Sequence, residues 1–532
     1  MEKHSSTDLF NALWSAADEM RATMSADVYK DYLLGLIFYK SLSDKTLYKV
    51  VDLLENSIPS SLEEAQSIYE ECEKEGGEDW SDLCDELRTD FGCLILPKYT
   101  FISFYNQINT SDFRLENLKQ AFREIELSQN SFYDGLFDDF DITSKDLGKN
   151  PQERNIMVAS VIKALADINF TEYDDDALGD AYEYLISKFA SESGKKAGEF
   201  YTPQPVAKLI SKIVAYGREK KDGFSIYDPC CGSGSLLLQI KHFMYKGATD
   251  EEDYTRHIQF YGQELKNQTY NLARMNMMLH KVPAEQQHLN NGNTLGNDWP
   301  SEEPTNYDAI VMNPPYSQKW APIDSLLTDP RFSRYEKLAP KSAADYAFLL
   351  HGFYHLKTDG VMGIVLPHGV LFRGAAEGVI RKHLIEDGSI YAVIGLPANI
   401  FFSTSIPTTV IILKKNNINR DILFIDASKD FKKEKTRNTL TDEHIEKIFN
   451  AYVERKDIEK YAHLASFEEI KENDFNLNIP RYVDTFEEEE EINIDECFKE
   501  LAEIDKEEEV LNKELNSYFK ELGLSFMLGK GE

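Results

Sequence analysis

Apolar and polar positions follow two different patterns along the chain, and the change falls near residue 200. In the first part, apolar side chains recur every three or four positions, as in LFNALWSAADEM (9–20) and YKDYLLGLIFYKSL (29–42). This spacing gathers apolar side chains on one face of an α-helix. The pattern therefore predicts a helical amino-terminal domain over residues 1–150.

A second helical stretch begins at Ile156, continues through 175–190 and leads to a Gly-Lys-Lys-Ala-Gly loop at 194–198. Beyond it, short apolar runs alternate with helical segments, and the runs are FSIYDP, IQFYGQE, YDAIVMNPP, VMGIVLP, YAVIGLP and TTVIILKK. Such alternation predicts an α/β domain, here residues 151–484, with a mostly parallel sheet covered by helices on both faces. Sheets of this kind bind ligands at the carboxyl ends of their strands, so the loops after these runs are the candidate sites.

The last segment, residues 485–532, has a third pattern. An acidic run from Glu487 to Glu491 precedes apolar residues at heptad spacing, and Glu508 interrupts that stripe. The apolar positions are Cys497, Leu501, Ile504, Leu511, Leu515, Tyr518 and Leu522. The pattern predicts an acidic helical tail that either packs on its own domain or pairs with a partner subunit, and we take partner binding as the hypothesis.

Length and composition are those of an ordinary globular chain. The 532 residues suggest roughly three folding units, and 42% of the residues are apolar. No run approaches the ~18 consecutive apolar residues of a membrane-spanning helix, and the first ten residues, MEKHSSTDLF, lack an apolar signal core. The six cysteines are scattered without CxxC spacing, which argues against a zinc site and against a disulfide framework. We expect a cytoplasmic protein with reduced thiols.

The first candidate site is the loop Asp228-Pro229-Cys230-Cys231-Gly232-Ser233-Gly234-Ser235, between the strand FSIY and the helical run LLLQIKHFM. Its glycines allow a sharp turn and a close approach to a ligand, at the start of a helix whose first N–H groups are unpaired. A Walker phosphate loop does not fit, because no GK[ST] follows. The next strand ends in Glu264, where a carboxylate can accept both hydroxyls of a ribose. Alone, each feature also fits a structural turn or a surface carboxylate, but together they predict a nucleoside pocket.

The second candidate site is Asn313-Pro314-Pro315-Tyr316, which follows the apolar strand YDAIVM. Two prolines fix the loop, and Asn313 projects from the carboxyl end of the strand. The side-chain oxygen of Asn313 and the main-chain oxygen of Pro314 can both accept hydrogen bonds from an exocyclic amine, which leaves the lone pair of that amine directed at an electrophile. Tyr316 can stack on a base. The alternative, a turn that merely ends a strand, does not account for the aromatic residue behind a nucleoside pocket.

With these motifs, the sequence from about residue 150 to the 480s resembles S-adenosylmethionine-dependent amino-methyltransferases. Specifically, it is similar to the modification subunit of type I restriction-modification systems, which implies a Rossmann-like methyltransferase core. The resemblance implies that Gly-Glu-Phe-Tyr-Thr-Pro at 198–203 closes over the methionine end of the cofactor, and that Asn313 to Tyr316 form the catalytic loop. Cofactor contact is carried over onto Glu199, Phe200, Tyr201, Thr202, Pro203, Gln204, Asp228, Gly232, Ser233, Gly234, Ser235, Glu264 and Asn293.

One position departs from the family pattern. In Asn291-Gly292-Asn293-Thr294-Leu295 the family generally has aspartate where this chain has Asn293, the residue that faces the adenine amine of the cofactor. The carbonyl oxygen of an asparagine can still accept that hydrogen bond, so we expect altered affinity and retained function.

Two further segments, 341–348 and 366–374, resemble family segments that border the target-base pocket. Asp345 and Arg373 either belong to that pocket or form a structural ion pair. We interpret His368 as a satisfied loop histidine, since that is more common than a proton carrier.

The resemblance also implies the reaction and the partners. A methyl group passes in line from S-adenosylmethionine to the N6 amine of an adenine extruded from double-stranded DNA, with no metal and no covalent enzyme intermediate. A separate specificity subunit selects the site, a restriction subunit joins for cleavage, and two copies of this chain accompany each specificity subunit. The net charge of −34, from 92 acidic and 58 basic residues, agrees with DNA binding that depends on other subunits. A chain that bound a duplex alone would normally be basic.

Three other functions fit part of the sequence. A stand-alone DNA adenine methyltransferase would need its own recognition region, and after Lys415 only about 120 residues remain, acidic and largely helical by their pattern. Protein glutamine methyltransferases also use Asn-Pro-Pro-Tyr, but they are much shorter and lack the segment at 198–203. A binding scaffold that has lost catalysis would not need an intact Asn-Pro-Pro-Tyr.

Overall fold

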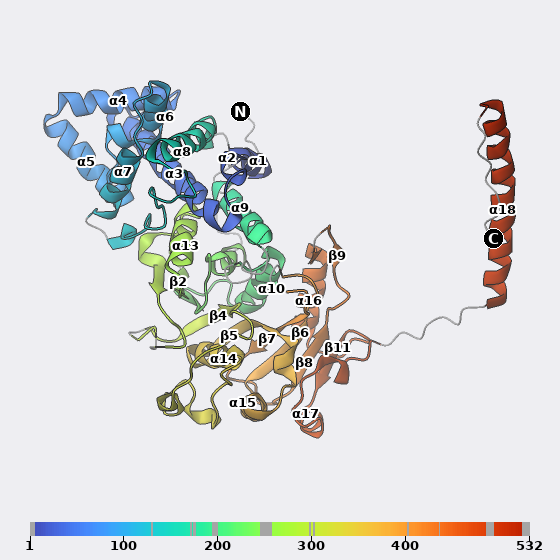
Figure 1. Ribbon diagram of the computed structural model, residues 1–532. Coiled ribbons are helices and arrows are strands. Elements are labelled where there is room, and N and C mark those ends of the chain that lie inside the picture. The colour runs from blue at the N-terminus through green and yellow to red at the C-terminus, as the bar shows by residue number, and fades with distance from the viewer. Residues whose placement is uncertain are drawn as a thin grey trace. The chain divides into compact units, whose positions relative to one another are not determined.

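The structure, a computed structural model, describes residues 6–16, 18–128, 131–170, 173, 177–193, 201–244, 258–296, 299–301, 304–401, 404–435, 437–485 and 494–523. The chain divides into two compact units, Met1–Asp484 and Thr485–Glu532. The first unit contains a helical part and a large sheet, and Figure 1 shows the helical part gathered on one side of the sheet.

The amino-terminal part is helical, as its apolar periodicity predicts. Its helices are α1 (Ser6–Ala16), α2 (Asp18–Arg21), α3 (Ala26–Glu55), α4 (Leu62–Glu75), α5 (Gly77–Phe91), α6 (Phe101–Asn109), α7 (Leu115–Glu126), α8 (Pro151–Ala166) and α9 (Ala177–Ser193). Helix α3 lies at the centre, and its apolar face shares one buried core with α1, α8 and α9. Helix α8 begins with a sequence-encoded cap, since the Asn150 side chain accepts from the Glu153 backbone N–H and Pro151 occupies the first turn.

The second part is built on one nine-stranded sheet in the order β11-β8-β6-β7-β5-β4-β1-β2-β3. The strands are β1 (Phe224–Asp228), β2 (Ile258–Glu264), β3 (Gln287–Asn291), β4 (Tyr307–Met312), β5 (Leu356–Pro367), β6 (Ile390–Gly395), β7 (Thr408–Leu413), β8 (Ile422–Asp426) and β11 (Ala462–Ala465). Strand β7 runs antiparallel to both neighbours and β11 runs antiparallel to β8, while all other pairs are parallel. The prediction of a mostly parallel sheet is confirmed, and each of the six apolar runs forms a strand.

The expectation for the region after Lys415 is wrong in part. Instead of being largely helical, this region adds β8 and β11 to the edge of the sheet, together with α16 (Asp442–Glu454) and α17 (Phe467–Glu472). It also contains a small separate hairpin of β9 (Lys432–Lys433) and β10 (Asn438–Thr439). The apolar run Ile422–Ile425 is fully buried, which explains why it pairs in the sheet.

Two layers of helices cover the sheet, because successive side chains of each strand point to opposite faces. In β4, for example, Ala309 and Val311 belong to one buried cluster, and Ile310 and Met312 belong to the other. One face carries α10 (Gln204–Ala215), α11 (Ser235–Leu238) and α16, and the other carries α14 (Asp345–Tyr354), α15 (Ala375–Glu386) and α17.

Helix α13 (Asn267–Leu279) joins the two parts of the first unit. Its Ala273 and Met277 pack in the core of the sheet, whereas Leu272, Met275 and Leu279 pack in the core of the amino-terminal helices. Figure 1 shows α13 between β2 and the helical part. Helix α13 therefore connects the helical part and the sheet next to the loops that follow β1 and β2.

The second unit contains helix α18 (Ile494–Glu521), as the tail pattern predicts. Within this unit the described heptad side chains lie on the surface of the helix, Leu501 and Leu511 among them. The acidic run from Glu487 to Glu491 lies outside the described residues. Across the parts of the chain that are described, no helix combines the length and the apolar character needed to span a bilayer.

Candidate active site

The topology brings the candidate loops to one edge of the sheet. Strands β4, β1, β2 and β3 are neighbours and run parallel, so their carboxyl ends meet at the same edge. Ligands of open α/β sheets bind at such an edge. The loops after these four strands carry all the motifs that the sequence predicts, apart from the segment at 198–204.

The loop after β1 adopts a backbone that requires its glycines. Gly232 and Gly234 have φ values of +55° and +77°, in the left-handed region that other residues seldom adopt. Asp228 closes the start of the loop, because its Oδ1 accepts the Cys230 backbone N–H at 2.9 Å. Ser233 and Ser235 are linked through their hydroxyls at 2.9 Å. The loop is thus ordered with its main chain turned toward the ligand side of the sheet edge.

Glu264 at the end of β2 is oriented by the main chain on both sides. Its Oε2 accepts the Gly232 N–H at 3.2 Å, and its Oε1 accepts the Lys266 N–H at 2.9 Å. Burial raises the pKa of Glu264, and these two N–H donors oppose that shift. The carboxylate is therefore held in one orientation next to the glycine loop.

Asp228 is the most strongly perturbed acid of the site. It is 1% exposed, and burial, followed by the charge of Glu264, raises its pKa to about 8, although the Cys230 N–H opposes this shift. A pair of buried carboxyl groups with raised pKa values is costly to ionise unless a cation lies beside it. The local electrostatics therefore favour a positively charged ligand.

A narrow cleft of about 10 Å³ is the point where three motifs meet. It is lined by Tyr201 and Thr202, by Asp228 and the loop at 230–236, and by Asn313. These residues are up to 112 positions apart in the sequence, so the fold alone brings them together.

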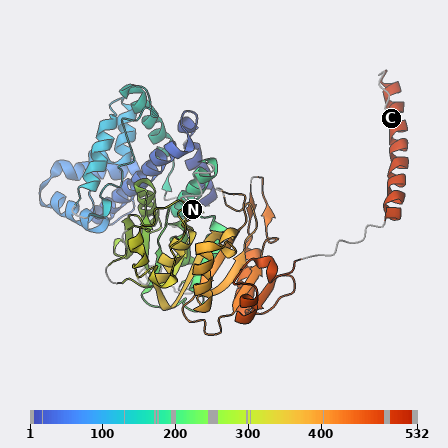
Figure 2. The same cartoon turned by 60° about the horizontal axis from the view of Figure 1, so that its bottom comes forward.

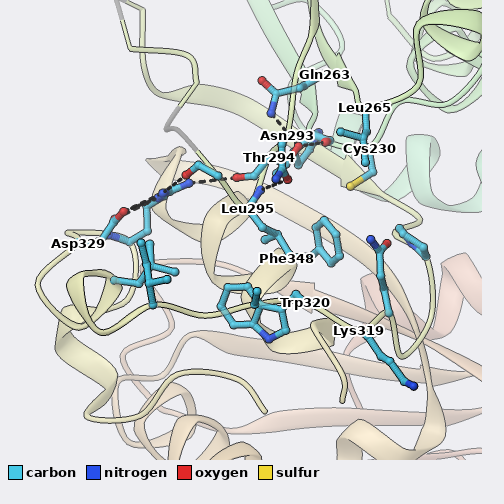
Figure 3. A pocket seen from close by; sticks show the side chains of 18 of the residues that line it. Cys230, Gln263, Leu265, Asn293, Thr294, Leu295, Lys319, Trp320, Asp329 and Phe348 are labelled. Atoms are coloured by element: carbon cyan, nitrogen blue, oxygen red, sulfur yellow. Dashed lines mark hydrogen bonds and ion pairs between the residues drawn. The ribbon is translucent and has the colours of Figure 1, made fainter. Parts of the chain in front are cut away.

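A larger cavity of about 1030 Å³ adjoins the cleft, since Cys230 and Asn313 line both. Glu264 and Asn293 face it, as do Pro315 and Tyr316 of the second motif. Its apolar wall contains Leu265, Leu295, Trp320 and Phe348, and Figure 3 shows Leu295, Trp320 and Phe348 close together in this wall. The combination of acidic, amide and aromatic groups suits a nucleoside.

Both ends of the Asn313 amide are bonded within the protein. Its Nδ2 donates to Thr202 Oγ1 at 3.1 Å, and its Oδ1 accepts the Tyr316 hydroxyl at 2.7 Å. Burial raises the pKa of Tyr316 well above its usual value, so this hydroxyl stays protonated and donates. The Tyr316 ring also meets the edge of Phe401, with ring centres 5.9 Å apart.

Asp345 holds the loop that contains Asn313 to Ser317. It is fully buried, its Oδ1 accepts the Ser317 backbone N–H at 2.8 Å, and its Oδ2 pairs with Arg373 at 2.6 Å. Arg373 in turn pairs with Glu377 at 2.6 Å. Asp345 and Arg373 are therefore paired charges that hold the residue after Tyr316. His368 Nε2 is bonded to the Thr408 main-chain oxygen at 3.0 Å, as expected for a satisfied loop histidine.

The loop that contains Asn293 is braced by a buried arginine. Arg331, 2% exposed, donates to the main-chain oxygens of Thr294 at 3.1 Å and Gly296 at 3.2 Å. Asn293 Oδ1 accepts the Leu295 N–H at 3.1 Å, which leaves the second lone pair of this oxygen for a ligand. The substituted asparagine is thus fixed at the wall of the larger cavity.

Helix α9 of the helical part reaches the same loops. Glu183 forms a side-chain hydrogen bond with Ser235, and burial raises the pKa of Glu183 to about 7. Ser187, one turn further along α9, bonds to Tyr201. This contact could not be predicted from the sequence, because a single glutamate on a helix resembles a surface residue.

Some of the sequence-predicted residues line the narrow cleft, some line the larger cavity, and others line neither. Tyr201, Thr202 and Asp228 line the cleft with Gly232, Ser233 and Ser235, while Glu264 and Asn293 line the larger cavity. Pro203 and Gln204 start α10 and line neither cavity, whereas Glu199 and Phe200 lie outside the described residues. Sequence reasoning missed Leu265 and Phe401, and it included Phe348 only as the last residue of the segment at 341–348. Leu265 carried a signal, as an apolar residue directly after the site acid, and Phe401 carried none.

Comparisons with known proteins cover both parts of the chain. The family model described as N-6 DNA Methylase matches residues 173–491, and that of the HsdM N-terminal domain matches residues 9–165. The chain is 32% identical to the type I restriction enzyme MpnII methylase subunit of Mycoplasma pneumoniae, over 97% of this chain and 96% of that protein. It is also 32% identical to the type I restriction enzyme MjaVIII methylase subunit of Methanocaldococcus jannaschii, over 95% of this chain and 83% of that protein.

A solved structure agrees with these matches. The methyltransferase subunit of a type I restriction-modification system from Streptococcus thermophilus is 56% identical to this chain and superposes with a TM-score of 0.86. The match covers 91% of this chain and 100% of that structure.

Proposed function

The chain belongs to the N-6 DNA methylase family, as the methylase subunit of a type I restriction-modification system, and on this premise we propose which residues carry out its methylation of adenine N6. The observation that carries the proposal is the cleft at which Thr202, Asp228 and Asn313 meet beside the larger cavity.

We propose S-adenosylmethionine as the methyl donor, and the donor set of the site fits it. The two buried acids, Asp228 and Glu264, suit a cationic ligand that also carries ribose hydroxyls. Leu265 and Phe348 offer apolar surface to an adenine ring, and Asn293 offers an amide oxygen to its amine. When bound, this cofactor supplies an electrophilic methyl group on a positively charged sulfur.

The residues of the chain around that group bind the cofactor and orient it. Glu264 holds the ribose hydroxyls, Asp228 neutralises positive charge, and Tyr201 and Thr202 close the methionine end of the cleft. Leu265 and Phe348 keep water from the purine. Because Glu264 is fixed by Gly232 and Lys266, its orientation is set before the ligand arrives.

The target adenine enters from the DNA by extrusion, which costs a few kcal/mol. Tyr316 and Phe401 provide aromatic surface that offsets part of this cost. Asn313 Oδ1 and the Pro314 main-chain oxygen accept hydrogen bonds from the N6 amine. As positive charge develops on that nitrogen, these oxygens stabilise it, and Thr202 holds the amide so that its oxygen faces the substrate.

We further propose the composition of the assembly. A specificity subunit selects the DNA sequence, two copies of this chain accompany it, and a restriction subunit joins for cleavage. The exposed apolar stripe of α18 supports partner binding by the tail, since Leu501, Leu511 and Leu515 are all accessible.

The substitution Asn313→Ala tests the proposed chemistry. In the complex with its specificity subunit, we expect the variant to lose at least a hundredfold in methylation of duplex DNA while its affinity for the cofactor changes less than threefold, roughly. Transfer of a labelled methyl group measures the first quantity, and calorimetry measures the second. Asn416→Ala, at an exposed loop position, is the control and keeps full activity. Retained turnover in Asn313→Ala would remove Asn313 from its role.

A further inference from the structure

The β9–β10 hairpin is a basic, exposed feature at the catalytic edge that the proposed methyl-transfer mechanism does not use. Residues 428–439 contain five basic and two acidic residues, in a chain whose net charge is −34. Lys432, Lys433 and Lys435 are exposed. Of the two acids, Asp430 is buried and paired with Lys447 at 2.7 Å, so it does not offset the lysines.

The hairpin is anchored at the same sheet edge as the site. It follows β8, which runs parallel to β6, and β6 runs in the same direction as β4 and β1. Asn438 at the base of the hairpin donates from its N–H to the Asn399 oxygen at 2.9 Å and from its side chain to the Ala398 oxygen at 2.8 Å. This 398–401 segment ends in Phe401, whose ring contacts Tyr316.

The base of the hairpin also lies near the proposed cofactor side of the site. Burial raises the pKa of Tyr201 to about 12, the Glu183 carboxylate adds to the shift, and the charge of Arg437 opposes it. Arg437 therefore lies near Tyr201. The base of the hairpin thus borders both the target-base residues and the cofactor residues.

The tip of the hairpin stands clear of the sheet. Figures 1 and 2 both show β9 projecting from the body of the molecule, on the side of the sheet where the helical part lies. Phe431, next to the lysines, is 37% exposed. Lysines also protect free strand edges from aggregation, but such a role does not require the hairpin to be anchored on the 398–401 segment.

We infer that Lys432 and Lys433 contact the phosphates of the DNA strand that flank the extruded adenine. Extrusion rotates a nucleotide about its backbone, so the phosphates on either side of it must lie at the mouth of the cavity. An exposed pair of lysines there neutralises phosphate charge without reading sequence. In a chain with strong net negative charge, this local attraction also offsets the general repulsion of DNA.

This inference rests on the proposed function, and its test uses the complete complex with the specificity subunit. The variant is Lys432→Ala with Lys433→Ala. The matched control is Lys220→Ala with Lys471→Ala, two exposed lysines, of which Lys220 precedes the amino end of β1 and Lys471 lies on α17. The measurements are binding of duplex DNA against salt concentration, KM for DNA, kcat at saturating DNA and affinity for the cofactor.

We expect the hairpin variant to lower the slope of log K against log salt by about two, close to one phosphate contact per lysine. Its KM for DNA should rise roughly tenfold, while kcat at saturating DNA and cofactor affinity match the control. A salt slope equal to that of the control would overturn the inference. So would loss of subunit assembly with an unchanged slope, which would assign the hairpin to a protein partner. If the unsubstituted complex transfers no methyl group to DNA, the proposed function itself fails, and that result is distinct from either outcome.

Discussion

At the scale of single residues, the acceptor that the adenine amine needs is already bonded. Asn313 Oδ1 accepts the Tyr316 hydroxyl at 2.7 Å, while Thr202 binds the other end of the amide. An amide oxygen has two lone pairs, so the Tyr316 hydroxyl occupies one of them and leaves the other for the proposed substrate amine. We propose separate roles for the two parts of Tyr316: the ring stacks on the base, and the hydroxyl only occupies one lone pair of the acceptor.

The substitution Tyr316→Phe separates these roles. Because the ring remains and the acceptor is free, we expect kcat within about threefold of the unsubstituted chain and an equal or lower KM for DNA. Tyr316→Ala removes the stacking surface, worth roughly 1–3 kcal/mol per base, and should lower kcat/KM at least tenfold. Steady-state methylation of duplex DNA by both variants measures this. Equal losses in the two variants would show that the hydroxyl takes part in the reaction.

The raised pKa of Asp228, about 8 in the free site, predicts a pH dependence of cofactor affinity. A cation favours the ionised carboxylate, so affinity is complete above pH 8 and falls up to tenfold per pH unit below it. Calorimetric titration at several pH values between 6 and 9 measures the effect. Asp228→Asn should bind weakly with a flatter profile, while Asp324→Asn, at an exposed acid near the cavity, serves as control. An unchanged affinity between pH 6.5 and 8.5 in the unsubstituted chain would contradict this role.

At the scale of elements, helix α9 links the helical domain to the cofactor loops. Glu183 on α9 is bonded to Ser235, and Ser187 on α9 is bonded to Tyr201. The carboxyl group is buried, so its ionisation opposes folding. Helix α9 therefore contributes Glu183 to the wall of the site, and burial in that wall raises the pKa of this carboxyl group.

The substitution Glu183→Gln tests this burial through stability. Since folding raises the pKa of Glu183 to about 7, its contribution to stability is complete below its unfolded pKa and is lost as the pH rises through 7. We expect the variant to gain roughly 2 kcal/mol in unfolding free energy at pH 8 relative to the unsubstituted chain, and to gain far less at pH 5. Thermal denaturation at both pH values measures this, with the exposed Glu116→Gln as control. A difference independent of pH would be inconsistent with a buried, titrating carboxyl group.

Most strands of the sheet could be predicted from the sequence, but one strand and one strand direction could not. Six strands were predicted because each is a continuous apolar run that becomes fully or almost fully buried, as in Tyr307–Met312. Strand β3, QHLNN, has one apolar residue and forms only because β2 offers an edge for pairing. The antiparallel direction of β7 could not be predicted either, because a buried apolar run has the same sequence pattern in parallel and antiparallel pairs.

The candidate site shows a similar division. Asp228, Glu264 and Asn313 could be proposed from motifs at the ends of strands. The residues of such a motif are adjacent in the sequence, so their pattern can be seen without knowing the fold. Phe401 joins the site only through tertiary packing, and an isolated phenylalanine looks like a core residue. Phe348 belongs to the segment at 341–348, for which the resemblance gave a position near the pocket but no contact. The roles assigned to the motif residues remain predictions for the experiments above.

At the scale of the whole molecule, charge and the tail both point to partners. The net charge of −34 opposes the approach of DNA, and we propose that a second chain provides much of the hold on the duplex. Helix α18 carries an exposed apolar stripe of the kind that pairs with another helix. We therefore propose that catalysis and assembly reside in the two separate units of the chain.

Replacing Leu511 and Leu515 by glutamate tests the role of the tail. We expect the variant to lose copurification with the specificity subunit, because two buried charges would cost several kcal/mol at a helix interface. Its affinity for the cofactor should stay unchanged. Lys506→Glu with Lys513→Glu, at exposed positions of the same helix away from the apolar stripe, is the control. Normal assembly of the leucine variant would show that the tail does not bind this partner.

The central claim is that the methyl donor lies beside Asn313, where the narrow cleft meets the larger cavity. A crystal structure of the chain with a non-reactive analogue of S-adenosylmethionine tests it most directly. We expect the amino-acid end between Thr202 and Asp228, the ribose on Glu264, and the atom that stands for the sulfur next to Asn313. Analogue bound away from Asn313, with the cleft at Asp228 empty, would contradict the account.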